Sequence, residues 1–318
     1  MAIPQAGIFA IGEPSHIFLE FSVVAGVEPA ALVRAVADVH EPRTTVGGVN
    51  LVAGFRPELW RAAAPNDTPA KLTGFNAPLQ GAGTYTMPAT QADVWMWFAG
   101  ASYDVVFESA SDAIKNLTGV LTLERELSGW SYRHSRDLTG FEDGTENPTL
   151  TQAPLIACVP DGSPGAGGSV LLFQKWRHDG SQFIDLPVPE QENVIGRTKT
   201  DSIQFPDDIM PKDAHVPRTT VVVDGNELDI FRRNAPYGTV VEHGTAFVGF
   251  SQDQFRLDKM LRQMAGSDDG IRDALTRYTT ALTGAYYFVP SMGYGCRSGR
   301  GTSRRTARWG RGRRRCRR

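Results

Sequence analysis

Cysteine is scarce in this chain of 318 residues, which contains only three. Two of them, Cys296 and Cys316, lie close to the C-terminus and leave Cys158 alone in the rest of the chain. Residues 1–292 therefore hold no pair of cysteines for a disulfide framework. They also lack the cysteine ligands of a structural zinc or iron–sulfur site.

Long apolar runs are also missing. No stretch reaches the roughly 18 consecutive apolar residues of a transmembrane helix, which argues against a membrane protein. The first residues, MAIPQAGIFAIGEPSH, lack the basic start and the apolar run of a secretory signal. We therefore expect a cytoplasmic protein with no membrane partner.

Acidic residues and lysine are absent from residues 293–318, which contain 11 Arg and 6 Gly. The whole chain has a formal net charge of −2, but without this tail 22 basic side chains face 35 acidic ones, a net charge of −13. An acidic body argues against nucleic-acid binding by residues 1–292. The tail itself is predicted to be disordered. It is either an arm that neutralises phosphates or, as we favour, a non-native, frameshift-like end.

Histidine pairs typical of zinc sites are missing as well. The six His are scattered and form no HExxH or HxH pattern: His16, His40, His134, His178, His215 and His243. A single axial ligand to heme iron needs only one of them. His215, in the segment DAHVP, is expected in a loop that enters a strand, and His178 and His243 are the rival ligands. For any one of the three, a surface histidine without a ligand role is the commoner outcome.

Apolar periodicity predicts similar element orders in the two halves. In the first half we expect strands at His16–Val24, Val49–Phe55, Asp93–Phe98 and Val120–Glu126, with helices at Glu28–Val39 and Tyr103–Leu117. In the second half we expect strands at Ser169–Trp176, Thr219–Val223, Glu227–Arg232, Thr245–Phe250 and Ala285–Val289, with helices at Pro189–Ile195 and Phe255–Met264. The order β-α-β-β-α-β is that of a ferredoxin-like unit.

The predicted fold class is therefore α+β, with two ferredoxin-like domains of the dimeric α+β barrel type. We expect the first domain at residues 1–135, the second at residues 136–292 and the Arg/Gly-rich tail at residues 293–318.

Three segments of the second half concentrate polar side chains. GFEDGTENP, residues 140–148, sets Asp143 on a tight turn between two glycines, which let the backbone approach a bulky group. FRRN, residues 231–234, ends a strand with two Arg that must face opposite ways, so at most one is catalytic. IGRTK, residues 195–199, offers Arg197 to an anionic group. Taken singly, each is more commonly an ordinary polar turn or a pair of exposed cations.

Together, these segments carry a resemblance to a known family. GFEDGTENP, VIGRTK, AHVP, IFRRNAPYG and TGAYYFVPS occur in the order and rough spacing of the bacterial dye-decolorizing peroxidases. The chain resembles the shorter bacterial class over essentially all of residues 1–292. The resemblance implies heme b as cofactor, two ferredoxin-like units and a heme pocket in the C-terminal half.

Carried over position by position, the resemblance implies a role for each site residue. His215 is similar to the proximal ligand of the heme iron, and Glu227 to the acid that hydrogen-bonds this histidine. Asp143 and Arg232 are similar to the distal catalytic pair, with Asn234 beside them, and Arg197 to the arginine that meets a heme propionate. Trp176 and Tyr237 are candidate electron carriers to a donor at the surface.

The implied activity is that of an oxidoreductase which reduces H2O2 and oxidises dye-like, phenolic or porphyrinogen donors. A heme-handling protein for storage, delivery or iron release uses the same pocket residues and stays open as the alternative. A small-molecule binder that has lost heme is a third, weaker hypothesis.

We expect a homo-oligomer because exposed sheet edges tend to pair. The tail does not resemble the peptide that directs some family members into a protein nanocompartment, which argues against such cargo. Nucleic acid is a partner only if the tail is genuine.

Overall fold

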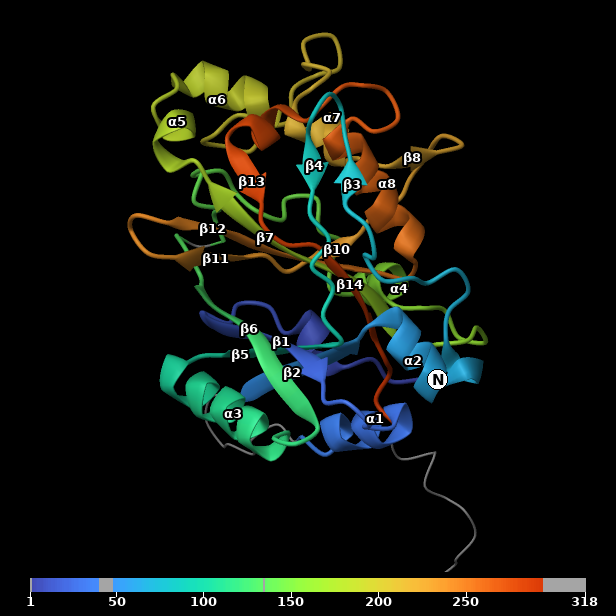
Figure 1. The fold of residues 1–318 in the computed structure, drawn as a ribbon. Coiled ribbons are helices and arrows are strands. Elements are labelled where there is room, and N and C mark those ends of the chain that lie inside the picture. The colour runs from blue at the N-terminus through green and yellow to red at the C-terminus, as the bar shows by residue number, and fades with distance from the viewer. Residues whose placement is uncertain (1, 40–47, 134, 294–318) are drawn as a thin grey trace, which may run out of the picture.

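The computed structural model describes residues 2–39, 48–133 and 135–293, and it stacks the two halves of the chain on each other (Figure 1). The N-terminal half contributes strands β1 (Ser15–Val23), β2 (Val49–Phe55), β5 (Val94–Gly100) and β6 (Leu121–Trp130), with helices α1 (Pro29–Ala37), α2 (Pro57–Ala63) and α3 (Tyr103–Asn116). All six elements expected here from periodicity are present. Helix α2, which begins at a proline in its first turn, was not predicted.

The C-terminal half holds strands β7 (Ser169–His178), β10 (Phe231–Arg232), β11 (Ala235–Gly238), β12 (His243–Ser251), β13 (Thr279–Ala281) and β14 (Ala285–Val289). Its helices are α4 (Ala153–Ala157), α5 (Gly180–Ile184), α6 (Val188–Ile195), α7 (His215–Thr219) and α8 (Gln254–Ala265). Helix α8 buries Leu257, Met260, Leu261 and Met264, as its spacing predicts.

The strands of the two halves close into one antiparallel barrel. Around the ring the order is β1, β5, β2, β14, β7, β12, β11 and β6, and β6 pairs again with β1. Phe288 of β14 pairs with Phe55 of β2 at one junction, and Tyr237 of β11 pairs with Gly129 of β6 at the other. This closure confirms the predicted α+β barrel class. The predicted domain limits stay a prediction, because the two halves share a continuous sheet.

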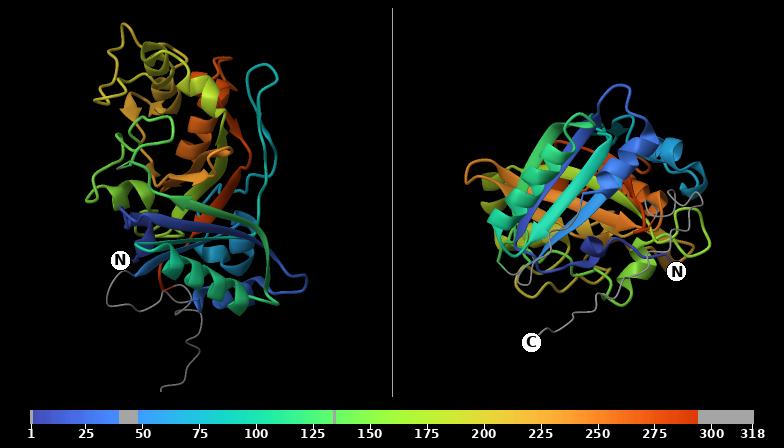
Figure 2. Two further views of the ribbon diagram at one scale, coloured as in Figure 1. Left: turned by 90° about the vertical axis from the view of Figure 1, so that its left-hand side faces the viewer. Right: turned by 90° about the horizontal axis from the view of Figure 1, so that it is seen from below.

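The barrel interior is filled by side chains from both halves. Phe18, Trp95 and Trp97 come from the N-terminal half, and Phe173 and Tyr287 from the C-terminal half, all at most 2% exposed. A second apolar cluster lies outside the ring, under the covering helices. Figure 2, in its view from below, shows the blue and green helices lying across the outer face of the N-terminal strands. β5 and β14 thus pack on both faces, which accounts for their dense apolar runs.

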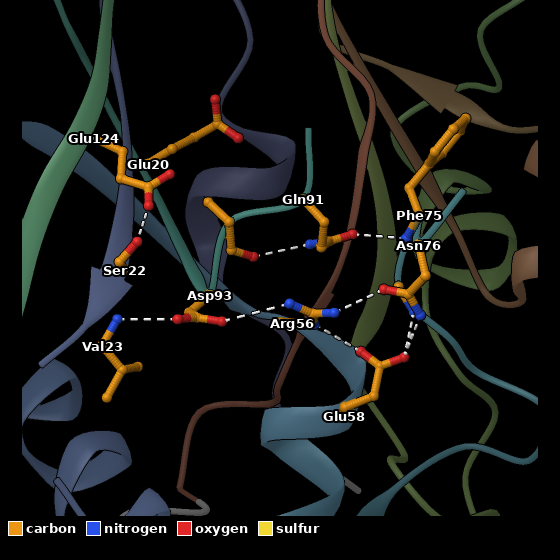
Figure 3. Close-up of polar contacts among 12 residues, drawn as sticks. Glu20, Ser22, Val23, Arg56, Glu58, Phe75, Asn76, Gln91, Asp93 and Glu124 are labelled. Carbon is orange, nitrogen blue, oxygen red and sulfur yellow. Dashed lines mark hydrogen bonds and ion pairs between the residues drawn. The ribbon is translucent and has the colours of Figure 1, made fainter. Parts of the chain in front are cut away.

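Two contacts outside the ring connect the N-terminal half of the chain to the C-terminal half. A hairpin of β3 (Leu79–Gln80) and β4 (Thr86–Met87) rises along α8 in Figure 1, and the Ala82 N–H donates to the Ala265 carbonyl at 2.8 Å. The second contact is made by Gln91, which belongs to a polar network of the N-terminal half that also includes Arg56 (Figure 3). The Gln91 side-chain oxygen accepts a hydrogen bond from the Tyr286 N–H of β14 at 3.0 Å.

Alternation along β7 and β12 prepares one outer face of the C-terminal half for function. Leu171 and Phe173 point into the barrel, so Gln174, Trp176 and His178 face outward. These three side chains, with Thr245 and Phe247 of β12, line a cavity that α7 and α8 cover from the other side.

Some local expectations were wrong. His215 begins the short helix α7 rather than standing in a loop before a strand. The hairpin expected around Asp224 and Gly225 forms, but its strands β8 (Val222–Val223) and β9 (Asn226–Glu227) have two residues each. Both turn residues have positive φ, 51° and 77°, as a tight two-residue hairpin loop requires. Residues 228–230 then leave the hairpin, and β10 pairs with β12 instead.

No helix among the described residues has the length and apolar character to cross a membrane. Residues 294–318, which make up almost all of the predicted tail, and the histidines His40 and His134 lie outside those described.

Candidate functional site

A large cavity opens on the outer face of β7 and β12. Its empty volume, counted with its open mouth, is about 1480 Å3. Helices α7 and α8 contribute an apolar side with Val216, Met260 and Met264, next to Leu275, and Phe247 of β12 adds a further apolar side chain. Polar side chains from residues 137–146 and from β10 line the rest of the cavity. All six residues expected at the site, from five separate segments, line this one cavity.

His215 lies in the cavity wall with one ring nitrogen fixed from behind. Its Nδ1 lies 2.7 Å from Oδ2 of Asp273, a carboxylate that is completely buried. The other oxygen, Oδ1, accepts the Leu275 N–H at 2.9 Å at the start of the 3-10 turn Ala274–Arg277. A histidine whose Nδ1–H is held by a carboxylate keeps the lone pair of Nε2 for a metal.

The partner of His215 is therefore Asp273, and the expectation that Glu227 fills this place is wrong. Glu227 belongs to the β8–β9 hairpin, where it is exposed and borders the cavity. Partial burial and the nearby carboxylates of Asp229 and Glu146 raise the pKa of Glu227. Asp273 follows α8, 58 residues after His215, and only the tertiary fold brings the two together.

Asp143 stands in the cavity wall, at the centre of the GFEDG turn. Gly140 and Gly144 on either side have φ of 88° and 80°, a region that side-chain-bearing residues rarely adopt. A Cβ on Gly144 would lie 2.9 Å from the amide nitrogen of Asn147, so the turn requires glycine there. Asn234 Nδ2 donates to Asp143 Oδ1 at 3.3 Å, while Asn234 itself is anchored by the Val248 N–H at 3.1 Å.

Burial raises the pKa of Asp143, the nearby positive charge of Arg232 opposes this shift, and the carboxylate of Asp137 adds to it. The hydrogen bond from Asn234 and the charge of His215 when protonated also act to lower the pKa. A carboxyl group with a raised pKa, facing a cavity beside a fixed cation, is suited to taking up and returning a proton.

The two arginines of FRRN face opposite ways, as alternation predicts. Arg232 lines the cavity. Arg233 points into the barrel, where its guanidinium donates to the Ile8 carbonyl at 2.7 Å and lies 4.9 Å from the centre of the Trp97 ring. Only Arg232 is therefore available to a ligand in the cavity.

Asn147, which was not assigned a role from the sequence, fixes the backbone of Arg232. Its Nδ2 donates to the Arg232 carbonyl at 2.9 Å, and its Oδ1 accepts the Arg232 N–H at 2.9 Å. Because β10 lies at the edge of the sheet, this amide pairs with the strand as a further strand would. The Asn-Pro dipeptide of GFEDGTENP indicates a turn, but gives no sign of this contact.

Arg197 is 8% exposed and lines the cavity close to its rim. Its guanidinium donates to the Ser202 carbonyl at 3.0 Å, to Gln204 Oε1 at 2.9 Å and to the Glu146 carboxylate. Glu146 itself is mostly exposed. The Arg197 guanidinium is thus held by two neutral oxygens and is paired with the exposed Glu146 carboxylate, which a ligand carboxylate at this place would have to join or displace.

The rival histidines are close by but differently bound. His178 also lines the cavity, and its Nε2 lies 3.1 Å from the Thr245 hydroxyl, which leaves that nitrogen occupied. His243 is next to His178, with ring centres 6.4 Å apart, and does not line the main cavity. Trp176 lines the cavity, whereas Tyr237 is buried on β11 below the Lys175 ammonium.

Known proteins with similar sequences and folds share this arrangement of elements. A family model described as "Dyp-type peroxidase, C-terminal" matches residues 134–294. The dye-decolorizing peroxidase of Mycolicibacterium paratuberculosis is 36% identical over 299 residues, covering 88% of this chain and 82% of that protein.

Solved structures of dye-decolorizing peroxidases are also similar to this chain. A variant of DypB from Rhodococcus jostii RHA1 in complex with heme is 33% identical, with a TM-score of 0.80 and coverage of 89% of this chain and 96% of that one. The encapsulated DyP-type peroxidase of Mycobacterium smegmatis is 32% identical, with a TM-score of 0.82 and coverage of 92% and 96%. With this identity along most of its length, and with the family's motifs gathered around one cavity, the chain belongs to the family of dye-decolorizing peroxidases.

Proposed function

We propose that the cavity binds heme b between His215 on one side and Asp143 with Arg232 on the other, and that peroxide reacts on the second side. The observation that carries this proposal is the pair of His215 and the buried Asp273, which leaves Nε2 of the histidine for iron. Family membership supports the cofactor and the reaction class, a heme-dependent peroxidase. The alternative, a heme-handling protein, is not better supported.

The residues present fit heme chemically. The apolar side of the cavity suits a porphyrin, and Arg197 at the rim suits a propionate. Gln174 lines the same cavity, and its side-chain nitrogen is buried and has no hydrogen-bond partner in the described part of the chain. An unpartnered buried amide costs about 1–3 kcal/mol, so a polar ligand group that accepts from it would stabilise the protein.

When bound, heme supplies a ferric centre that binds peroxide and stores two oxidising equivalents for the donor. The chain's own residues then manage charge and protons. Asp273 accepts a hydrogen bond from Nδ1–H of His215, which holds the ring in one tautomer and makes Nε2 a stronger donor to metal. Asp143 takes a proton from the bound peroxide oxygen and returns it to the leaving oxygen, as the opening of the O–O bond requires. Arg232 offsets the negative charge on that leaving oxygen, and Asn234 holds the carboxyl group toward both.

The cavity also bears on the electron donors and on the partners of the protein. We infer dye-like, phenolic or porphyrinogen donors that reach the cavity mouth or pass electrons through Trp176, which lines it. Homo-oligomerisation and a cytoplasmic location stay predictions. So does the expectation that this chain is not nanocompartment cargo, although one structural neighbour is encapsulated.

Replacement of His215 by alanine tests the axial assignment, with His178→Ala as the matched control from the same cavity wall. We expect parent and His178→Ala to bind heme with the absorption band of a histidine-ligated ferric centre, and His215→Ala to lose it. Heme titration of the purified apo-protein followed by visible absorption measures this directly. Retention of heme and turnover in His215→Ala, with loss of both in His178→Ala, would reverse the assignment.

A further inference from the structure

His178 stands between the main cavity and a second, smaller one. The smaller cavity has an empty volume of about 260 Å3, counted with its open mouth as for the main cavity. Thr139, His178 and Thr279 line both cavities and so form the wall between them. On the far side of this wall His243 lines the smaller cavity, at the start of β12 next to the exposed Glu242. His178 therefore touches both the proposed reaction space and the path toward the surface.

A hydrogen-bonded chain leads from His178 to a second carboxylate in the main cavity. His178 Nε2 lies 3.1 Å from the Thr245 hydroxyl, and this hydroxyl in turn donates to Oδ2 of Asp137. An ionised carboxylate can only accept a hydrogen bond. The Thr245 hydroxyl therefore donates its hydrogen bond to Asp137 and accepts one from the Nε2–H of His178. The three groups thus form a directional row in which each hydrogen bond carries one transferable proton.

The charge states of the row suit proton passage at neutral pH. Burial raises the pKa of Asp137, but the charge of His178 when protonated and the hydrogen bonds from Thr245 and Thr139 outweigh it, so the pKa falls below its usual range. Burial lowers the pKa of His178, with a contribution from His243, against the opposing carboxylates of Asp137 and Asp179. A neutral imidazole next to an ionised carboxylate can accept a proton at Nδ1 while it releases another from Nε2.

Peroxide reduction requires a supply of protons to the main cavity. Reducing one H2O2 to two waters consumes two electrons and two protons, and the cavity is apolar on its covered side. We propose that His178, Thr245 and Asp137 form a proton relay that connects the peroxide-reducing cavity with the surface by way of the smaller cavity. The proposal rests on the proposed placement of peroxide chemistry in the main cavity.

The transfer is balanced at every step. A proton arrives at Nδ1 of His178 from a water in the smaller cavity or from His243. The Nε2 proton moves to Oγ1 of Thr245, and the hydroxyl proton of Thr245 moves to Oδ2 of Asp137. Asp137 then releases a proton into the main cavity, where it shares the wall with Asp143. One proton enters, one leaves, and only N–H and O–H bonds are exchanged.

The chain offers a matched pair of variants. Thr245→Val removes the hydroxyl that joins His178 to Asp137 and keeps the shape of the side chain. Thr279→Val is the control, because Thr279 lines the same two cavities but its hydroxyl donates only to the Leu275 carbonyl, at 3.1 Å. His178→Gln is a second variant that interrupts the row from another strand.

Cyanide binding to the heme-loaded protein gives a readout separate from turnover. Hydrogen cyanide binds ferric heme as the anion, so a group in the cavity must take up its proton and pass it on to solvent. We expect Thr245→Val and His178→Gln to slow association and dissociation about tenfold with an unchanged Kd, and Thr279→Val to match the parent. A higher concentration of a non-coordinating buffer such as phosphate should restore the rate of cyanide association in the two variants. Replacement of H2O by D2O should slow cyanide association more in the two variants than in the parent.

Two results would overturn the relay. One is that Thr245→Val and His178→Gln match Thr279→Val in rate, isotope effect and buffer response. The other is that their Kd changes with no response to buffer, which means that the row only holds the fold of residues 137–146. Failure of the parent itself to bind heme and cyanide would instead refute the proposed function of the cavity.

Discussion

Removal of the Asn147 side chain should release Arg232 from the cavity wall. Asn147 makes two hydrogen bonds of 2.9 Å to the Arg232 backbone, one as donor and one as acceptor. Each is worth about 1 kcal/mol net, so Asn147→Ala should lower the free energy of unfolding by about 2 kcal/mol. The same energy corresponds to roughly 30-fold in an equilibrium constant. We therefore expect kcat/KM for H2O2 to fall by at least about tenfold as Arg232 loses its fixed position.

Two further variants calibrate this loss. Asn147→Asp keeps the acceptor for the Arg232 N–H but loses the bond to the carbonyl, so about 1 kcal/mol or more should be lost. Asn50→Ala is the control, since Asn50 donates a hydrogen bond to Glu13 at 3.1 Å, far from the cavity residues in the sequence. Urea unfolding of the apo-protein gives the stabilities, and steady-state kinetics with heme give kcat/KM. Equal stability losses in Asn147→Ala and Asn50→Ala, with unchanged kcat/KM in both, would refute the positioning role of Asn147.

Two predictions concern pH. Arg232→Leu removes a positive charge that lowers the pKa of Asp143, so this pKa should rise and Asp143 should stay protonated to higher pH. If ionised Asp143 accepts the first proton, the acid limb of kcat/KM for H2O2 must move to higher pH, and a limb that stays or moves down contradicts this role. His16 has its pKa lowered to about 4 by burial and by Arg233, so the unfolded chain takes up a proton between pH 6.5 and 4 that the folded chain does not. Stability should fall by up to about 3 kcal/mol over this window as pH decreases. In His16→Gln, whose oxygen can still accept from Trp97, urea unfolding at pH 4.5 and 7 should show a smaller difference than in the parent.

The long strands and helices could be predicted because the apolar residues of each recur at the spacing of a strand or a helix. β2 and β14 begin and end where apolar patterning placed them, at Val49–Phe55 and Ala285–Val289. The short helices α2, α4 and α5 have five to seven residues, too few to show a helical repeat, and their prolines and glycine indicated loops.

The site was predictable where one short segment carries the chemistry, and not where the fold joins distant segments. Asp143 and Arg232 sit in compact motifs, and both line the cavity. Asp273 and Asn147 contact residues 58 and 85 positions away, so no local pattern indicates those contacts. The family resemblance assigned Glu227 to His215, but the two-residue hairpin strand leaves Glu227 exposed.

Closure of the barrel by the last strand constrains how the chain matures during synthesis. β14 supplies the neighbour of β2, and β11 that of β6, so the first half leaves the ribosome with both sheet edges unsatisfied. Trp95 and Trp97 likewise have part of their packing partners more than 70 residues downstream, at Phe173 and beyond. The nascent first half therefore depends on shielding from aggregation until β14 emerges. The cofactor, whose proposed ligand and wall belong to the second half, can be captured only after most of the chain has been made.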